Sequence, residues 1–136
     1  MTSRAVEPNW LTIADLVAIN EAEVAETGEP FALVRPDMLE SALGSPVNRR
    51  LYEREEDVLV LGVFLLLAIA RNHPFAQGNK RTAFTAFNIF LELNGYALDI
   101  PDRAIWGDKV VSLMLGGTTE TEFIAEIEPY VVPLSG

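Results

Sequence analysis

The chain has 136 residues, of which 49% are hydrophobic and 22% charged, a composition typical of a globular domain rather than a disordered segment. Its 20 acidic and 10 basic side chains give a formal charge of -10, which disfavours nucleic acid or an anionic membrane as a partner of the whole surface. The chain has no cysteine, which excludes disulfides and thiolate metal sites, and a cytoplasmic location is expected.

Two helices are predicted in the first third of the chain. The first follows Thr12, which can cap it, and ends at Gly28, because glycine is favoured just after a helix. The second is short, from Pro36, a residue favoured in the first turn, to Gly44. The stretch that follows, 45–56, is charged and contains a proline, so it is predicted to be a looser connection.

A helix that is apolar on all sides is predicted at about 57–71, with Asp57 as its cap. Its apolar run, 58–70, is shorter than the roughly 20 residues that a membrane-spanning helix needs, so no membrane segment is predicted. An all-round apolar helix of this length fits the centre of a bundle. The sequence therefore predicts an all-α bundle built around this helix.

The next segment combines a loop with a new helix. Pro74 disfavours helical geometry at His73, so the chain is predicted to turn over 73–78 and to enter a helix over 79–94. No long alternating strand pattern and no repeat is visible beyond it. The segment 96–100 is predicted to be extended. Two further helices are predicted, one over 101–115 and one from about Thr119.

His73 is the only histidine of the chain, and a lone histidine is more often structural than catalytic. Its surroundings favour catalysis, because it lies in a loop stiffened by proline and faces a helix start that is rich in hydrogen-bond donors. A base held beside an anion site is the arrangement that general base catalysis requires. His73 is therefore predicted to be a catalytic base.

The start of the helix after that loop is predicted to bind phosphate. Unpaired backbone N–H groups and the positive end of the helix dipole favour an anion there, and glycine lets the backbone approach closely. The alternative is a helix cap followed by two solvated bases. The motif is not a P-loop, because asparagine rather than glycine precedes the lysine. The predicted phosphate-binding residues are Gly78, Asn79, Lys80 and Arg81.

The run His73-Pro-Phe-Ala-Gln-Gly-Asn-Lys-Arg-Thr resembles the signature of the death-on-curing (Doc) toxins of the Fic superfamily. The resemblance extends from about Glu7 to Tyr130 and implies one all-α Fic/Doc-like domain over residues 1–136. The further segments that carry it are Trp10-Leu-Thr, Leu39-Glu-Ser-Ala-Leu, Ala70-Arg-Asn and Phe90-Leu-Glu-Leu-Asn-Gly-Tyr.

The resemblance implies the toxin of a type II toxin–antitoxin system. Fic enzymes usually carry glycine at the position of Lys80 and transfer adenylyl groups to protein hydroxyls. Doc toxins carry lysine and transfer the terminal phosphate of ATP to a threonine of elongation factor Tu. A cytoplasmic protein kinase that modifies a Ser or Thr hydroxyl of a translation protein is therefore implied. The implied partner is a Phd-like antitoxin peptide, with no direct binding to nucleic acid or membrane.

Carried over by position, the resemblance gives each residue of the loop a role. His73 is implied to accept the proton of the target hydroxyl, and Phe75 to anchor the loop. ATP and Mg²⁺ are the implied cofactors. Gln77 stands where the family has Asp or Asn near the metal, and its carboxamide offers an oxygen without charge, so it is predicted to be a weak magnesium ligand.

Two alternatives to the kinase stay open at this point. An adenylyl transferase would use the same residues and differ only in the consequence of Lys80. A catalytically weak domain would keep the fold and bind a partner or a nucleotide after losing strong metal affinity at Gln77.

Overall fold

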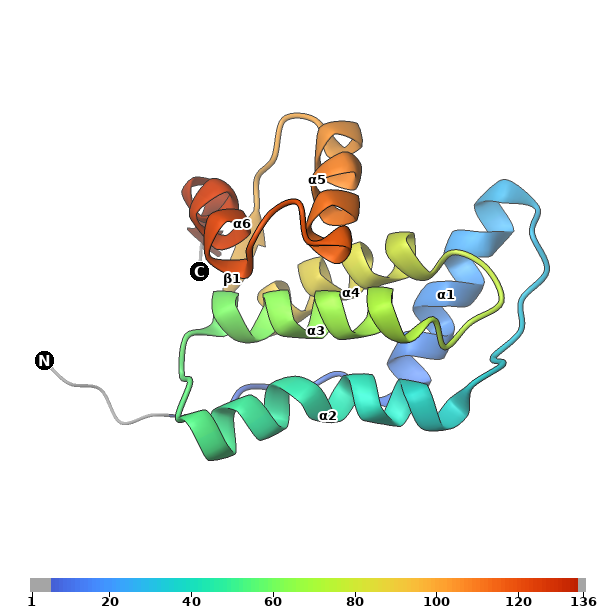
Figure 1. Ribbon diagram of the computed structural model, residues 1–136, viewed down its shortest axis with the longest axis horizontal. Helices are drawn as coiled ribbons and strands as arrows, with labels where there is room; N and C mark the ends of the chain where they lie inside the picture. Colours follow the sequence, from blue (N-terminus) through green and yellow to red (C-terminus); the bar gives the residue numbers. More distant parts are fainter. Residues whose placement is uncertain (1–5, 135–136) are drawn as a thin grey trace, which may run out of the picture.

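The computed structural model describes residues 6–134, which form six α-helices, one 3₁₀ helix and a two-stranded sheet (Figure 1). The all-α prediction is confirmed, and no described helix is both long and apolar enough to cross a bilayer. The elements in chain order are α1 (Ile13–Thr27), α2 (Pro36–Glu53), α3 (Val58–Asn72), α4 (Asn79–Leu93), β1 (Tyr96–Leu98), α5 (Arg103–Leu115), α6 (Glu120–Ile127), η1 (Glu128–Tyr130) and β2 (Val131–Pro133).

Helix α3 is the centre of the bundle, as predicted. Ten of its 15 residues are buried, because its apolar side chains point in every direction around the helix axis. Helices α2 and α4 pack on two of its sides, and α5 and α6 contact it as well (Figure 1). A Cβ atom placed on Gly62 would lie 3.0 Å from Cδ1 of Phe87, so glycine allows α3 and α4 to approach closely.

The prediction of a short helix that ends at Gly44, with a loose connection after it, is wrong, since α2 continues to Glu53. Proline inside a helix removes a hydrogen bond and costs about 3 kcal/mol, which is why the sequence predicts an end there. Pro46 is nevertheless buried in the bundle. One turn later the Arg49 guanidinium lies 3.4 Å from the centroid of the Phe64 ring of α3. These tertiary contacts keep the helix intact past the proline.

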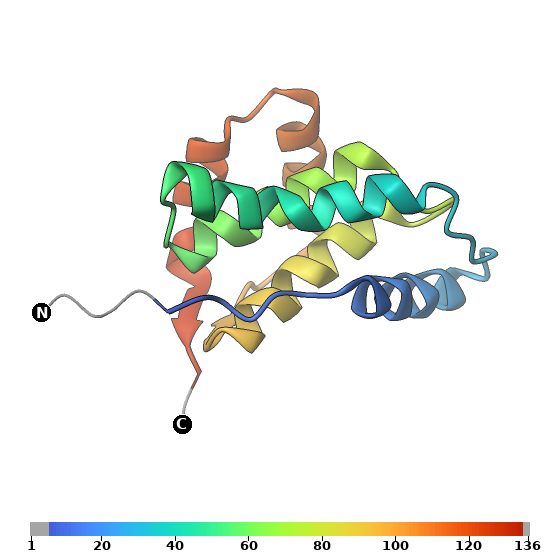
Figure 2. The same ribbon diagram turned by 90° about the horizontal axis from the view of Figure 1, so that it is seen from below.

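The first and the last described segments both contact the end of α4 (Figure 2). The N-terminal segment is attached there, because the backbone N–H of Asn9 donates to Oδ1 of Asn94 over 2.8 Å. Strand β1, in the segment predicted to be extended, pairs antiparallel with β2, with Ala97 opposite Val132. Helices α5 and α6 between these strands start close to where the sequence predicts them.

Candidate active site

His73 ends α3 in the left-handed region, with φ 47° and ψ 56°. A proline at the next position disfavours helical geometry, so the helix stops here and the chain turns, as predicted. The imidazole is exposed, whereas the carbonyl oxygen of His73 accepts a hydrogen bond from Nη1 of Arg35 over 3.2 Å. The backbone of this residue is thus fixed while its side chain is open to a ligand.

The loop after His73 is fastened to the body of the protein at Phe75, whose side chain is 2% exposed. Its backbone N–H donates to Oδ1 of Asn79 over 3.0 Å, and its carbonyl accepts from Nδ2 of Asn79 over 2.8 Å. Phe75 also forms an isolated β-bridge with Leu33, in the segment that joins α1 to α2. Both polar atoms of the Asn79 side chain are therefore used to shape the loop.

Helix α4 begins after Gly78, which has φ 72° and takes the capping position. Asn79 does not cap this helix, and neither does any other side chain of residues 6–134. A Cβ atom on Gly78 would approach Nη2 of Arg81 to 3.2 Å and Cγ1 of Val24 to 3.3 Å, and its backbone angle would be strained. Glycine thus leaves the backbone N–H groups of the first turn open.

Asn20 of α1 supports this helix start from inside the protein, and its side chain is completely buried. Its Nδ2 donates to the carbonyl of Gln77 over 2.9 Å and to the hydroxyl of Thr82 over 3.0 Å. No motif in the sequence points to this residue. The available signal is its spacing, because Asn20 lies four residues from both Leu16 and Val24 on the buried side of α1.

Arg81 is held against the end of α1 by an ion pair with Glu29, to which no motif in the sequence points. Its Nη2 lies 2.5 Å from Oε1 of Glu29, and its Nη1 donates to the carbonyl of Glu23 and to the hydroxyl of Thr27, each over 3.2 Å. Hydrogen bonds from Thr27 and Arg81 lower the pKa of Glu29. The guanidinium therefore already holds one carboxylate where a phosphate could bind.

The predicted site residues gather around one cavity of about 300 Å³, formed where the loop meets α4. His73 from the end of α3 lies on its wall together with residues of the α4 start, and Glu29 lies on the same wall. Phe75 does not line it. The predicted residues that do are His73, Gln77, Gly78, Asn79, Lys80 and Arg81.

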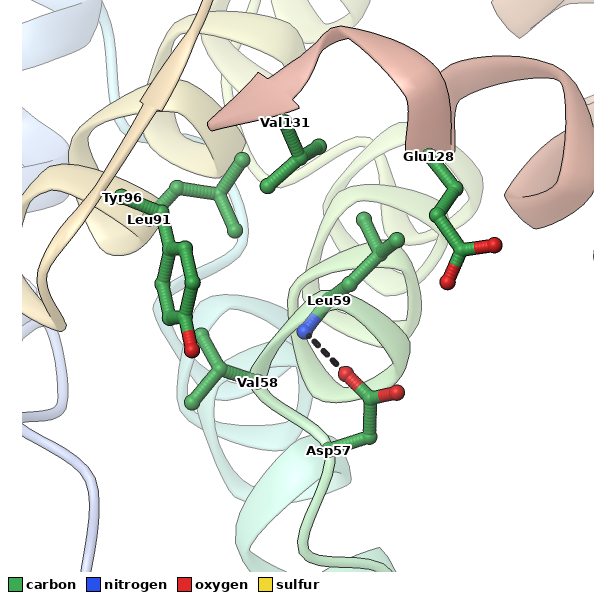
Figure 3. Close-up of a pocket in the computed structure, with 7 residues that line it drawn as sticks. All are labelled: Asp57, Val58, Leu59, Leu91, Tyr96, Glu128 and Val131. Atoms are coloured by element: carbon green, nitrogen blue, oxygen red, sulfur yellow. Dashed lines mark hydrogen bonds between the residues drawn. The ribbon is translucent and has the colours of Figure 1, made fainter. Parts of the chain in front are cut away.

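A smaller hollow of about 220 Å³ lies at the start of α3 (Figure 3). It carries two carboxylates, from Asp57 and Glu128, and the phenol of Tyr96. The Asp57 carboxylate accepts the backbone N–H of Leu59 over 2.9 Å and so caps the helix. Because carboxylates repel anions, this hollow is unsuited to phosphate.

Two comparisons identify the family. Residues 10–91 match the model of the Fic/DOC family. The chain is also 32% identical over 91 residues, which are 66% of this chain and 72% of the relative, to "Protein kinase doc" of Escherichia phage P1.

The chain belongs to the Fic/Doc family. The family match contains the whole loop and the start of α4, together with Asn20 of α1 and Glu29, which follows α1. Helices α5 and α6 lie after the matched residues. The Fic/Doc assignment therefore rests on the part of the chain that builds the cavity.

A magnesium ion at the cavity of this Fic/Doc chain would need carboxylate oxygens as ligands. No group of three or more histidine or acidic side chains converges within residues 6–134. Gln77 is exposed and neutral, and Glu29 is paired with Arg81. These residues do not fit a magnesium ion held by the protein alone, since Mg²⁺ in proteins is usually bound through carboxylates and substrate phosphates.

Proposed function

We propose that this chain is a Doc-type toxin with protein kinase activity, which transfers the terminal phosphate of ATP to a Ser or Thr hydroxyl of another protein. The observation that carries the proposal is the position of His73, which lines the same cavity as Lys80 and Arg81 at an uncapped helix start. Phosphoryl transfer requires mainly positioning and neutralisation of charge, and these residues can supply both.

In the proposed reaction the oxygen of the target hydroxyl attacks the terminal phosphorus of ATP. His73 accepts the hydroxyl proton, the bond between the terminal phosphorus and the bridging oxygen breaks, and ADP leaves. Lys80, Arg81 and the open N–H groups of α4 stabilise the negative charge of the phosphates. Glu29 occupies Nη2 of Arg81, so a phosphate that binds at this nitrogen competes with the carboxylate.

Magnesium enters this proposal through the nucleotide. Gln77 offers one neutral oxygen at the edge of the cavity, and ATP phosphates supply the charged ligands that a hard cation prefers. No step of the transfer is assigned to the metal. Phe75 is proposed as the anchor of the loop on the strength of its burial and its bonds to Asn79.

The proposal extends to the cellular setting that the Doc relationship suggests. The chain would act in the cytoplasm as the toxin of a type II toxin–antitoxin pair, with a Phd-like antitoxin peptide as its inhibitor. Its target would be a translation protein such as elongation factor Tu. The name of the phage P1 relative, a protein kinase, supports the kinase part of this proposal.

The experiment that tests the proposal uses ATP labelled on either the terminal or the first phosphate, incubated with purified protein and bacterial lysate. Label from the terminal phosphate alone should appear on a protein. Transfer of the first phosphate would show an adenylyl transferase instead. Transfer of neither label, with ATP binding retained, would leave a binding domain and overturn the enzymatic proposal.

A further inference from the structure

The buried polar side chains of the protein gather at one place, the start of α4. Within residues 6–134 they are Asn20, Asn79 and Thr82, and the other buried side chains are apolar. Burying a polar group costs free energy unless new hydrogen bonds replace those to water, and an apolar contact of the same shape is often as stable. The position of this cluster beside the cavity therefore favours a role in the geometry of the site.

Asn20 joins α1 to both sides of this helix start, where α1 packs against α4 (Figure 1). Its Nδ2 donates to the carbonyl of Gln77, before the glycine, and to the hydroxyl of Thr82, in the first turn. A Cβ atom on Gly78 would lie 3.5 Å from the same nitrogen. Oδ1 of Asn20 is buried without a hydrogen-bond partner among residues 6–134, which costs stability. What Asn20 contributes therefore comes from the two bonds that its nitrogen donates.

The bond to Gln77 fixes the direction of one peptide unit. The C=O of Gln77 and the N–H of Gly78 belong to the same trans peptide group, so they point in opposite directions. Since the carbonyl points to Asn20 in the interior, the N–H of Gly78 points away from Asn20. This N–H forms no hydrogen bond with residues 6–134, and both Gln77 and Gly78 line the active-site cavity.

We propose that Asn20 is a positioning residue, which holds the Gln77–Gly78 peptide so that the N–H of Gly78 faces a phosphate of the nucleotide. This inference rests on the proposed function, which puts phosphates beside Lys80 and Arg81. Glycine adopts positive and negative φ about equally well, so its own backbone does not select one orientation of this peptide. Asn20 selects it from the interior, and thereby adds one donor to the anion site without touching the ligand.

Calorimetric titration of the full chain with ATP and with inorganic tripolyphosphate tests this inference. Asn20→Leu keeps a similar side-chain shape and removes the donor to Gln77, so affinity for both ligands should fall about tenfold or more. Thr82→Val is the matched control, because it removes only the second acceptor of Asn20. It should lower the melting temperature and leave both affinities within about twofold of wild type.

The double variant Asn20→Leu with Thr82→Val separates positioning from stability. Replacing both partners of a buried hydrogen bond by apolar groups of the same shape is nearly neutral for stability. The double variant should therefore melt above Asn20→Leu, yet bind both ligands as weakly as Asn20→Leu does. Recovery of wild-type affinity together with the melting temperature would overturn the inference, because Asn20 would then act through stability alone.

The amide resonance of Gly78 in ¹⁵N-labelled protein reports on the direction of the peptide. Tripolyphosphate should shift this resonance strongly in wild type and in Thr82→Val, but only weakly in Asn20→Leu. An equal shift in all three proteins would contradict a role of Asn20 in orienting this N–H.

A failure of the proposed function would look different. If wild-type protein binds neither ATP nor tripolyphosphate, the phosphate site at the start of α4 is wrong, and the inference about Asn20 falls with it. If wild type binds both ligands and Asn20→Leu binds them as tightly, the phosphate site stands and only the inference about Asn20 is overturned.

Discussion

The start of α3 is capped by the Asp57 carboxylate, which accepts a backbone N–H, whereas the start of α4 follows a glycine and has no side-chain cap within residues 6–134. The hollow beside the first contains two carboxylates (Figure 3), and the cavity beside the second contains Lys80 and Arg81. Both helices leave backbone N–H groups without intrahelical partners.

The difference separates a helix start that serves stability from one that can serve a ligand. At α3 the Asp57 side chain accepts a hydrogen bond from a backbone N–H of the first turn, and most side chains of the helix are buried in the core. At α4 the open N–H groups, the two cations and the exposed imidazole of His73 lie in one cavity. In a chain with a formal charge of -10, an anion site has to be local, and we propose the start of α4 as that site.

Removing the proposed base beside α4 should have the largest effect on the rate of phosphate transfer. His73→Ala and His73→Asn should each lower the rate of phosphate transfer by about 10² to 10⁴ fold, because general base catalysis contributes about that much. Asparagine tolerates the left-handed backbone better than alanine, so it controls for strain at this position. Initial rates and thermal melts separate chemistry from folding, and a wild-type rate in both variants would contradict the assignment.

The next largest effect should come from removing the Arg81 guanidinium, which should lower ATP affinity. Arg81→Ala should weaken ATP binding about ten- to one-hundredfold, since hydrogen bonds to a charged group contribute about 1.5 to 3 kcal/mol. Arg49→Ala is the control, because that side chain lies over Phe64 and does not line the cavity. Unchanged ATP affinity of Arg81→Ala, measured by calorimetry, would limit this arginine to its contacts with Glu23, Thr27 and Glu29.

Replacing Lys80 should change which product the enzyme forms. Lys80→Gly should cut phosphate transfer about tenfold or more and allow an adenylyl product, if the side chain blocks one way of binding ATP. Lys80→Met keeps most of the volume without the charge, and should lose rate while still yielding only the phosphate product. Mass spectrometry of the modified target reads out both variants. Full phosphate transfer by Lys80→Gly would show that nucleotide orientation is set elsewhere.

A smaller gain is expected from a charged ligand at the mouth of the cavity. Gln77→Asp should raise the rate of phosphate transfer about several-fold, because a carboxylate is a stronger magnesium ligand than a carboxamide. The rate should also depend more on magnesium. Gln77→Asn changes the side-chain length without adding charge and serves as the control. Identical magnesium titrations of Gln77→Asp and wild type would exclude a metal role for this position.

The smallest effect should come from the carboxylate that pairs with Arg81. Glu29→Gln keeps the side-chain volume and removes the charge, so ATP affinity should rise about threefold or less, as expected for a partly exposed ion pair. Because the pKa of Glu29 is lowered from 4.5, its stabilising contribution is present above that pH and is lost as pH falls through the lowered value. Melting temperatures of the two proteins should therefore converge at acidic pH, and a constant difference would contradict the ion pair.

The sequence predicts the elements whose signals are local. The apolar run of α3 identifies the central helix, and Pro74 with Gly78 places the turn and the start of α4. The continuation of α2 through Pro46 is missed, because tertiary packing rather than propensity maintains that helix. The second strand is missed for a similar reason, since β2 is defined only by its pairing with a distant segment.

Within the candidate site the same limit applies. The motif from His73 to Arg81 is visible because its residues are contiguous in the sequence. Asn20 and Glu29 contact it from positions more than 50 residues away, so no local pattern connects them to it. The roles of the site residues, and the extension of one domain to all 136 residues, stay predictions.

The most direct test of the phosphate site at α4 follows backbone amide shifts of ¹⁵N-labelled protein as ATP is added. We expect the largest changes at Asn79, Lys80 and Arg81, where open N–H groups face the cavity, and little change at Leu59, whose N–H is bound to Asp57. Saturating changes centred on α3, or none at the start of α4, would contradict the account.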